Sequence, residues 1–471
     1  MSKKSNTMRE LVKILAAMPA VVLPVVLVWG YIAFFPMHYF DGETPYYFWN
    51  RDISLTPSKK EYSTVILGDS AANAAYLPEV LSEDTINLSL GGTTPVENYY
   101  VLQDWLSMHA NPRVVYLSFM DYHLIYDNMF YERTVYSHRL RDSQEREILA
   151  EARECLDENI AVSDAEEKLV EYHLYSPRLY LPALLNAGFS QRKSQNEETY
   201  KAVDFHRGAY IGLTSQMYMD TDPNIYDSYP VNPLYDRYYH KILDLCKEKG
   251  IQVRIVSLPK TGNSLLKNSF RNSRDGYYRG LEETYENVTY VSAVDTMDNR
   301  YFLDWEHFNI YGAWAFSALL KSAFPNDFSK EPLSDDTVIG QLEYLKLMKE
   351  PDLLCQSITG KEFSAVLISE DKALAAKAGA KDTGTMMNRK HIFLRSEVLH
   401  GASFNENDGK DDTIAIVNNE DGTTALRLKD QWYPAAIDDY AGATLILISH
   451  RDNNVVEVRN YLSNGTGYLL K

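Results

Sequence analysis

Five short apolar runs, rich in β-branched residues, constrain the fold of this chain more than any other feature. They cover residues 63–67, 85–90, 114–118, 251–258 and 288–293. Runs that are apolar on both faces and separated by helix-length connections are typical of a parallel sheet covered by helices on both sides. Helical patterns at residues 96–108 and 235–249 fit this arrangement, and the second ends at Gly250 as a C-cap would. The sequence therefore predicts a three-layer α/β domain with a five-stranded parallel sheet over about residues 62–324.

The amino end carries an uncharged apolar segment. Residues 14–35 contain no charged side chain, which matches the roughly 20 apolar residues needed to cross a bilayer. Four basic residues precede it, namely Lys3, Lys4, Arg9 and Lys13. The positive-inside rule then predicts a cytoplasmic tail at residues 1–13, a single-pass transmembrane anchor in membrane lipid at residues 14–36, and an extracytoplasmic remainder. The alternative is a cleaved signal peptide, but the segment exceeds a typical signal core and no small-x-small site follows it, so we favour a retained anchor.

Long connections and a change in residue pattern divide the rest of the chain into segments. We expect a linker at residues 37–61 and an insertion at about residues 125–230, which is far longer than an ordinary α/β connection. The polar, Pro-containing residues 325–340 are typical of a second linker. Residues 341–471 contain hairpin patterns around Asp421-Gly422 and Asp452-Asn453. They predict a small α+β or mostly β accessory domain, to which the sequence assigns no role.

Charge and cysteine content exclude several classes of protein. The 471 residues carry a formal net charge of -18, which argues against a nucleic-acid partner because phosphate contacts need clustered Lys and Arg. The three cysteines, Cys155, Cys246 and Cys355, are widely spaced, so the sequence indicates neither a disulfide framework nor a zinc site. We expect no metal and no cofactor.

Two short motifs carry the chemistry expected of the α/β region. Gly68-Asp69-Ser70 ends the first strand, where α/β folds place their ligands and where a following helix offers N–H groups to an oxyanion. Asp304-x-x-His307 precedes the last helical run, and residues three apart share one face of a turn, so the carboxylate can orient the imidazole. Each motif alone is also typical of a helix cap. Their conjunction predicts a triad with Ser70 as nucleophile, His307 as base and Asp304 as its orienting partner.

These motifs resemble the first and last blocks of the SGNH/GDSL hydrolases over about residues 62–324. The segment 87–95, Asn-Leu-Ser-Leu-Gly-Gly-Thr-Thr-Pro, is similar to the second block of that family. The resemblance implies a flavodoxin-like three-layer sheet. It also implies an oxyanion hole formed by the backbone N–H groups of Ser70 and Gly92, with Gly91 as the alternative to Gly92.

The third block departs from the family pattern. Where the family commonly has Gly-x-Asn-Asp, residues 118–123 are Ser-Phe-Met-Asp-Tyr-His, so the asparagine that would supply an oxyanion donor is missing. We expect Asp121 or the hydroxyl of Tyr122 to shape the substrate pocket, with an ordinary loop role as the alternative. Asp69 beside the nucleophile and Arg207 in the insertion, where it would steady an anionic substrate, are two further pocket candidates.

The same departure, together with the anchor, is similar to the membrane-anchored acyltransferase subgroup typified by DltD, AlgJ and AlgX. This resemblance implies O-acetylation or O-acylation of a cell-surface or exported polysaccharide, beside a membrane-bound O-acyltransferase partner of the MBOAT type. The triad alone does not choose between a sugar hydroxyl and water as acceptor. Two alternatives stay open, namely a membrane-tethered carbohydrate or lipid esterase and a non-catalytic protein that binds polymer or a partner.

Overall fold

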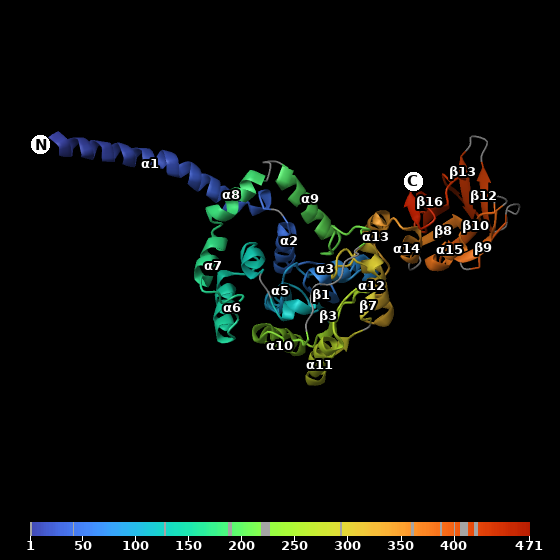
Figure 1. Ribbon diagram of the computed structural model, residues 1–471, viewed down its shortest axis with the longest axis horizontal. Coiled ribbons are helices and arrows are strands. Elements are labelled where there is room, and N and C mark those ends of the chain that lie inside the picture. The colour runs from blue at the N-terminus through green and yellow to red at the C-terminus, as the bar shows by residue number, and fades with distance from the viewer. Residues whose placement is uncertain are drawn as a thin grey trace.

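Three parts follow one another along the chain: the long helix α1 (Ser2–Phe34), an α/β body and a β-rich carboxyl-terminal domain. Figure 1 shows α1 reaching away from the body on the side opposite to the carboxyl-terminal domain. The computed structural model describes residues 2–40, 42–126, 129–186, 191–217, 227–292, 294–358, 362–386, 389–399, 401–405, 413–418 and 423–471. Residue 293, the last of the fifth predicted run, and Asp421-Gly422, the centre of the first predicted hairpin, lie outside the described residues.

A five-stranded parallel sheet forms the centre of the body. Its strands are β1 (Thr64–Gly68), β2 (Thr85–Asn87), β3 (Val114–Ser118), β4 (Gln252–Val256) and β6 (Val288–Val291). They lie in the order β2-β1-β3-β4-β6, with Thr64 opposite both Thr85 and Val114. The chain therefore passes to β2 on one side of β1 and then to β3 on the other, and open α/β sheets bind ligands at such a reversal. Each predicted run contributes a strand, and the parallel sheet is confirmed.

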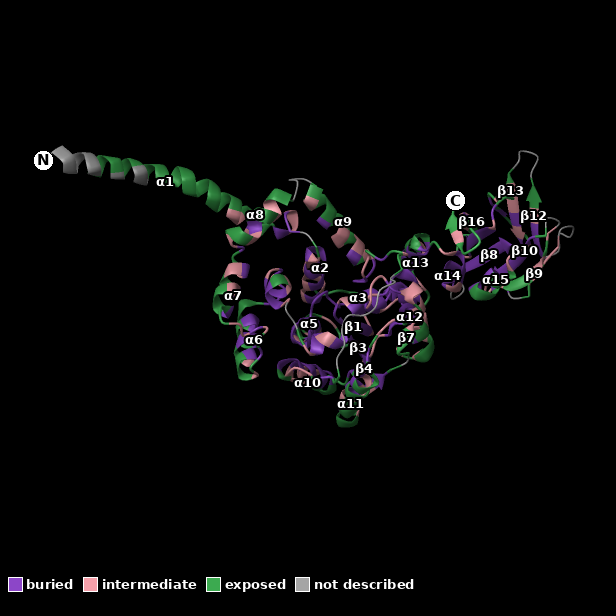
Figure 2. Ribbon diagram, viewed as in Figure 1, coloured by how far each residue is buried: buried purple, intermediate pink, exposed green. Residues whose placement is uncertain are grey.

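Helices cover both faces of the sheet, which confirms the predicted three layers. Alternate strand residues point to opposite faces, so Ile66 packs on one side and Val65 and Leu67 on the other. The Ile66 face is covered by α3 (Ser70–Ala75), α4 (Pro78–Leu81) and α12 (Ile310–Ala323). The opposite face is covered by α5 (Pro95–Met108), α10 (Pro233–Glu248) and α11 (Asn268–Thr284). Figure 2 shows buried residues concentrated between these layers.

The connection from β3 to β4 carries the predicted insertion. It contains η2 (Asp121–Leu124), the π-helical turn η3 (Phe130–Val135), α6 (Asp142–Glu154), α7 (Ala165–His173), α8 (Pro177–Asn186) and α9 (Gln191–Phe205). Buried residues such as Tyr131, Ile148 and Leu169 form a separate core here. Figure 1 shows α7 and α8 on the side of the body from which α1 emerges. The insertion is therefore a folded helical unit.

Residues 37–61 differ from the predicted linker. They contain α2 (Thr44–Leu55), which follows the short η1 (Pro36–His38). Pro45 lies in the first turn of α2, where proline is favoured because no intrahelical N–H bond is lost. Tyr47 and Trp49 are buried, and α2 packs against α5 and α9. These aromatic side chains give the segment enough apolar surface to fold onto the body.

The carboxyl-terminal domain combines two sheets with short helices, in agreement with the predicted α+β class. Its sheets have the orders β17-β16-β15-β8-β10-β9 and β11-β12-β13-β14. Its elements are α14 (Pro351–Gln356), β8 (Phe363–Ser369), α15 (Lys372–Ala378), β9 (Lys381–Thr385), β10 (His391–Arg395), β11 (Ser403–Phe404), β12 (Thr413–Asn418), β13 (Thr424–Leu428), β14 (Gln431–Pro434), β15 (Ala443–Ser449), β16 (Asn454–Ser463) and β17 (Tyr468–Leu470). The antiparallel pairs β12/β13 and β15/β16 confirm the two predicted strand pairings.

Residues 325–340 also differ from the predicted linker. Asp327 accepts hydrogen bonds from Tyr116 at 2.9 Å and from Arg254 at 2.8 Å, both of which belong to the sheet. Helix α13 (Asp335–Leu347) begins within the segment, and its Gln341 donates to the backbone carbonyl of Glu79 at 2.7 Å. Polar side chains in and after the segment thus fix it to the body.

Helix α1 contains the predicted apolar segment. Its residues Ala16–Phe34 are almost entirely exposed. Pro19 and Pro24 lie inside the helix without ending it. By length and composition, the helix is suited either to cross a membrane or to act as a signal sequence.

Candidate active site

Ser70 lies where β1 leads into α3. It is the first residue of α3, so its backbone N–H has no partner within the helix. Asp69 caps that helix by accepting hydrogen bonds from the backbone N–H groups of Ala71 and Ala72, at 2.9 and 3.4 Å. A Cβ atom on Gly68 would lie only 1.9 Å from a backbone carbonyl oxygen of β3. The turn therefore requires glycine, and it presents Ser70 at the carboxyl edge of the sheet.

The structure brings Ser70, His307 and Asp304 together. Ser70 Oγ lies 2.8 Å from Nε2 of His307, and Nδ1 of His307 lies 2.7 Å from Oδ2 of Asp304. The other carboxylate oxygen of Asp304 accepts hydrogen bonds from the backbone N–H groups of Glu306 and His307, at 2.8 and 2.7 Å. A hydroxyl, an imidazole and a carboxylate in this order form a hydrogen-bonded chain suited to proton transfer.

The turn that carries Asp304 and His307 is held at both ends. It begins after η4 (Asn299–Tyr301) and ends at α12. Phe302 and Phe308 are paired by an antiparallel bridge and are buried. Asn309 caps α12 by accepting a hydrogen bond from a backbone N–H of its first turn at 3.1 Å. Packing on one side and capping on the other thus fix the imidazole against Ser70.

Burial and pairing act in opposite directions on the two ionisable groups of the triad. Burial alone would lower the pKa of His307, but the hydrogen bond and negative charge of Asp304 outweigh it, so the pKa lies above its usual 6.5. Burial would likewise raise the pKa of Asp304, and the contacts with His307 hold it below its usual 3.8 instead. Asp304 is therefore anionic near neutral pH and keeps a proton on Nδ1. Once His307 is neutral, its Nε2 accepts from the hydroxyl of Ser70.

A cavity of about 330 Å³ opens beside Ser70 and His307, a volume within the range of small-molecule sites. Gly91 and Gly92 both line it. Gly92 has a left-handed φ of 70°, which glycine adopts without strain, and the carbonyl oxygen of Gly91 accepts a hydrogen bond from Tyr47 at 2.7 Å. The apolar and aromatic part of the lining consists of Tyr46, Ala74, Tyr122, Met129, Tyr210 and Leu303.

An ion pair on this cavity was not predicted from the sequence. Arg133 of η3 lies 2.5 Å from Glu43, the residue before α2, and both line the cavity. A Cβ atom on Gly91 would lie 1.9 Å from Glu43, and one on Gly92 would lie 2.9 Å from Arg133. The pair therefore packs directly on the two glycines. No motif marks either charged residue, and only the helix-start signal at Pro45 indicates that this part of the predicted linker is folded.

Of the four predicted pocket candidates, Tyr122 lines this cavity, whereas Asp69, Asp121 and Arg207 are not among its lining residues. Asp69 is fully buried. Besides capping α3, its carboxylate accepts hydrogen bonds from Nδ1 of His123 at 2.6 Å and from the backbone N–H of Met120 at 2.5 Å. Asp69 therefore joins the end of β1 to the segment after β3, and its partner His123 lines the cavity.

Asp121 belongs to a buried charge cluster behind the triad turn, which differs from its predicted place in the pocket. Its Oδ2 lies 3.7 Å from Lys260 and 3.4 Å from Arg274. Lys260 of β5 (Lys260–Thr261), which pairs with β7 (Thr296–Met297), also donates to Glu306 at 2.8 Å. Burial raises the pKa of Glu306 to about 7, although Lys260 acts to lower it. Asp121 thus helps to fix the residue that precedes His307.

Arg207 is buried and is not among the residues that line the cavity, which differs from its predicted place beside an anionic substrate. It is only 6% exposed. Its guanidinium donates hydrogen bonds to the backbone carbonyls of Ser82, Glu83 and Thr85, at 2.8, 2.6 and 3.2 Å. These bonds, all from one guanidinium nitrogen, hold the insertion to the start of β2.

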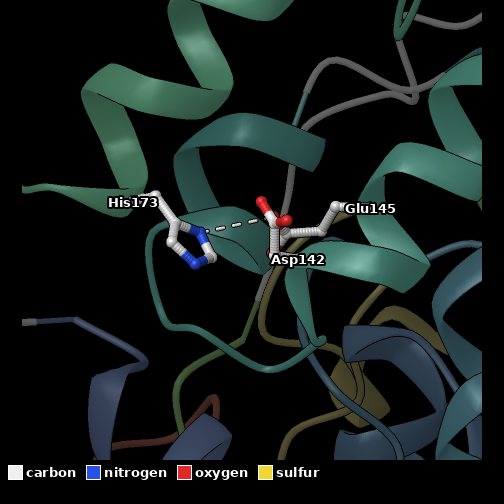
Figure 3. Close-up of side chains that lie close together, drawn as sticks. All are labelled: Asp142, Glu145 and His173. Carbon is white, nitrogen blue, oxygen red and sulfur yellow. Dashed lines mark ion pairs between the residues drawn. The ribbon is translucent and has the colours of Figure 1, made fainter.

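A cluster of two carboxylates and a histidine lies in the insertion, apart from the cavity (Figure 3). Asp142 and Glu145 of α6 and His173 of α7 place their ligand atoms within 4.8 Å of one another. Each carboxylate already has a counter-charge, because Arg146 binds Asp142 at 3.0 and 3.2 Å and Nδ1 of His173 lies 3.3 Å from Glu145. We therefore describe the cluster as ion pairs that join α6 to α7, and we assign no metal to it.

The chain of Ser70, His307 and Asp304, the two glycines beside it and the cavity in front of it together form a candidate active site. No model of a known protein family matches the sequence, and no curated protein matches it.

Proposed function

We propose that this chain is an SGNH-type serine acyl-transfer enzyme with Ser70 as its nucleophile. The observation that carries the proposal is the hydrogen-bonded chain from Ser70 through His307 to Asp304, with 2.8 and 2.7 Å between successive groups. These three side chains lie at the edge of the sheet where the strand order reverses, next to the ends of β1 and β3. Open α/β sheets usually bind their ligands at such a reversal. The order of the motifs along the sequence also agrees with the SGNH/GDSL resemblance.

The proposed mechanism has two half-reactions. In the first, Nε2 of His307 takes the proton from Ser70 Oγ while that oxygen attacks an acyl carbonyl. The backbone N–H groups of Ser70 and Gly92 stabilise the oxyanion. The tetrahedral intermediate then collapses, His307 gives its proton to the departing oxygen, and the acyl group stays as an ester on Ser70. In the second half-reaction, an acceptor hydroxyl loses its proton to His307 and attacks this ester. The second tetrahedral intermediate then collapses, and His307 returns the proton to Ser70 Oγ as the acylated acceptor leaves.

We further propose that the acceptor is a hydroxyl of an exported or cell-surface polysaccharide, and that a membrane-bound O-acyltransferase of the MBOAT type supplies the acyl group. Tyr46, Tyr122 and Tyr210 line the cavity, and tyrosine rings offer flat apolar faces and hydroxyls suited to sugars. Helix α1 supports work at a membrane, and the basic residues that precede its apolar segment favour the extracytoplasmic side for the remainder of the chain. Water as the acceptor would make the same site an esterase.

A serine-reactive fluorophosphonate tests the role of Ser70. We expect the full-length protein to be labelled and Ser70→Ala to lose the label, because the hydroxyl beside His307 is the activated one. Ser107→Ala, at an exposed position of α5, is the matched control and should label as the native protein does. Labelling that persists in Ser70→Ala would remove Ser70 from the role of nucleophile.

The acceptor is tested by following the acyl groups. In cells that carry Ser70→Ala, we expect the surface polymer to lose O-acyl groups while the amount of the protein stays unchanged. With purified protein, transfer requires a sugar acceptor and yields an acylated sugar, whereas an esterase releases free acid into water. Unchanged polymer acylation in the Ser70→Ala cells would contradict the transfer proposal.

A further inference from the structure

The carboxyl-terminal end of α1 packs against the insertion. The indole N–H of Trp29 donates a hydrogen bond to the backbone carbonyl of Leu174 at 2.5 Å. Ile32 is fully buried in an aromatic collar formed by Tyr39, Phe40, Tyr175 and Tyr180. Helices α1 and α8 are in contact, and Figure 1 shows α8 beside the base of α1.

The length of α1 sets the depth of this contact in a bilayer. Residues 14–34 extend over about 31 Å at the helical rise of 1.5 Å per residue, which just covers a hydrocarbon core of roughly 30 Å. If Trp29 lay above the bilayer, only residues 14–28 would remain for the span, about 22 Å, which is too short. Trp29 therefore lies within the outer part of the bilayer, about 8 Å from the end of the span at Phe34 and close to the interface, where tryptophan is enriched. Leu174 lies at the same level.

Helix α8 carries an apolar surface at this level. Tyr180 and Leu184 pack into the collar region, whereas Leu181 and Leu185 are 47% and 82% exposed. These two leucines are four residues apart, so they share one face of the helix. Leu174 and Phe34 are also exposed. Together these apolar side chains form a patch on adjoining elements, and its contact with water is energetically unfavourable.

We infer that α8 is a second membrane contact of this protein, whose Leu181 and Leu185 enter the outer-leaflet interface of the lipid bilayer beside α1. The surface is continuous with the apolar surface of α1, and its depth follows from the bond between Trp29 and Leu174. An amphipathic helix at this depth lies in the plane of the interface. The inference rests on α1 as a membrane span and not on the catalytic role of Ser70.

The consequence is that the cavity is held at a fixed height above the bilayer. Phe40 packs in the collar, with its ring centroid 4.8 Å from that of Tyr175. Three residues later, Glu43 pairs with Arg133 on the cavity wall. The collar thus connects two membrane contacts to the wall of the cavity. With a single flexible tether, the cavity would be free to change its orientation relative to the bilayer.

The test uses fluorescent probes and quenching lipids. Full-length protein with Cys155→Ser is placed in phosphatidylcholine vesicles and labelled with NBD at Leu185→Cys or Leu156→Cys; Cys246 and Cys355 are buried. Leu185 and Leu156 are matched, because they are 82% and 84% exposed and both belong to the insertion, but Leu156 follows α6, away from α1. Leu181→Cys repeats the test if Leu185→Cys does not fold. A probe at Val22→Cys in α1 reports whether the anchor is inserted.

We expect lipids with a doxyl group near the head group to quench the probe at position 185 at least twofold more than the probe at position 156. Equal quenching at the two positions would overturn the inference, as would a probe at position 22 that lipids with a doxyl group near the end of the acyl chain do not quench. NBD emission that moves to the blue at position 185 without lipid quenching would show that protein, such as a second copy, covers α8, and it would also overturn the lipid contact. Fluorophosphonate labelling of the same samples reports separately on Ser70.

Discussion

The two walls of the cavity are built in different ways. The wall with Ser70 and His307 consists of a strand end and a helix start at the edge of the sheet, joined by short hydrogen bonds. A second wall, with Glu43 and Arg133, is formed by the segment before α2 and by the insertion. The first wall holds the groups proposed to react, and the second holds charges and aromatic side chains. The sheet therefore positions the groups proposed to react, whereas elements added to the sheet line the rest of the cavity.

Removal of the proposed base should have the largest effect. His307→Ala leaves the Ser70 proton without an acceptor, so we expect the rate of fluorophosphonate labelling to fall by about 10⁴-fold or more. The rate constant is measured from labelling time courses on the full-length protein. His391→Ala is the matched control, because His391 also pairs with an aspartate, Asp382, at 3.0 Å but lies in the carboxyl-terminal domain. A similar loss in the control would indicate that the effect does not come from the cavity wall.

Neutralising Asp304 should have the next largest effect, about 10³-fold on the labelling rate. In the native protein, labelling should rise with pH as His307 loses its proton. The midpoint should lie above 6.5, because burial acts to lower the pKa of His307 and Asp304 outweighs it. In Asp304→Asn the negative charge is gone and burial dominates, so the midpoint should move to lower pH. The pH dependence of the labelling rate checks this, and an unmoved midpoint would count against Asp304 as the partner of His307.

Changes to the second wall should affect substrate binding more than chemistry. We expect Arg133→Ala to raise KM for a bulky acyl ester about tenfold, because Arg133 lies on the cavity but outside the hydrogen-bonded chain. Labelling by a small fluorophosphonate should change by less than about threefold. Glu43→Gln, which keeps the shape and removes the charge, is the companion variant. Steady-state kinetics and labelling rates are compared, and equal losses in both would break the distinction between the walls.

Arg207→Ala should have the smallest effect on the reaction and a measurable effect on stability. The substitution removes the guanidinium donor from the backbone carbonyls of Ser82, Glu83 and Thr85, so we expect the free energy of unfolding to fall by about 2–4 kcal/mol. Denaturant unfolding measures this change, with the exposed Arg279→Ala as control. A raised KM with unchanged stability would return Arg207 to the substrate side of the cavity.

The sheet and the triad could be predicted because each depends on a local pattern. The residues of β1 and β3 are apolar on both faces, and this pattern is typical of a strand that helices cover on both sides. Asp304 and His307 lie three residues apart in one turn, so their contact needs no knowledge of the rest of the fold. The position of Ser70 at the end of β1 then follows from the parallel sheet, whose strands all end at the same edge.

The rest of the site depends on contacts between distant segments. Glu43 and Arg133 meet only because α2 and the insertion fold onto the same part of the body. Asp121 and Arg207 look the same in the sequence whether water or protein surrounds them. Asp121 is buried beside Lys260, and Arg207 is buried against backbone carbonyls. These surroundings determine their roles, and neither leaves a periodic signal in the sequence.

The most direct test of Ser70 as nucleophile is to trap the acyl-enzyme and locate its acyl group. Full-length protein is mixed with a small activated acyl ester, quenched in acid within one turnover and digested, and the peptides are sequenced by mass spectrometry. We predict an acyl ester on Ser70 in the native protein and its absence from His307→Ala. Turnover of the ester with the acyl group on another residue, or with no acyl group on Ser70, would contradict this assignment.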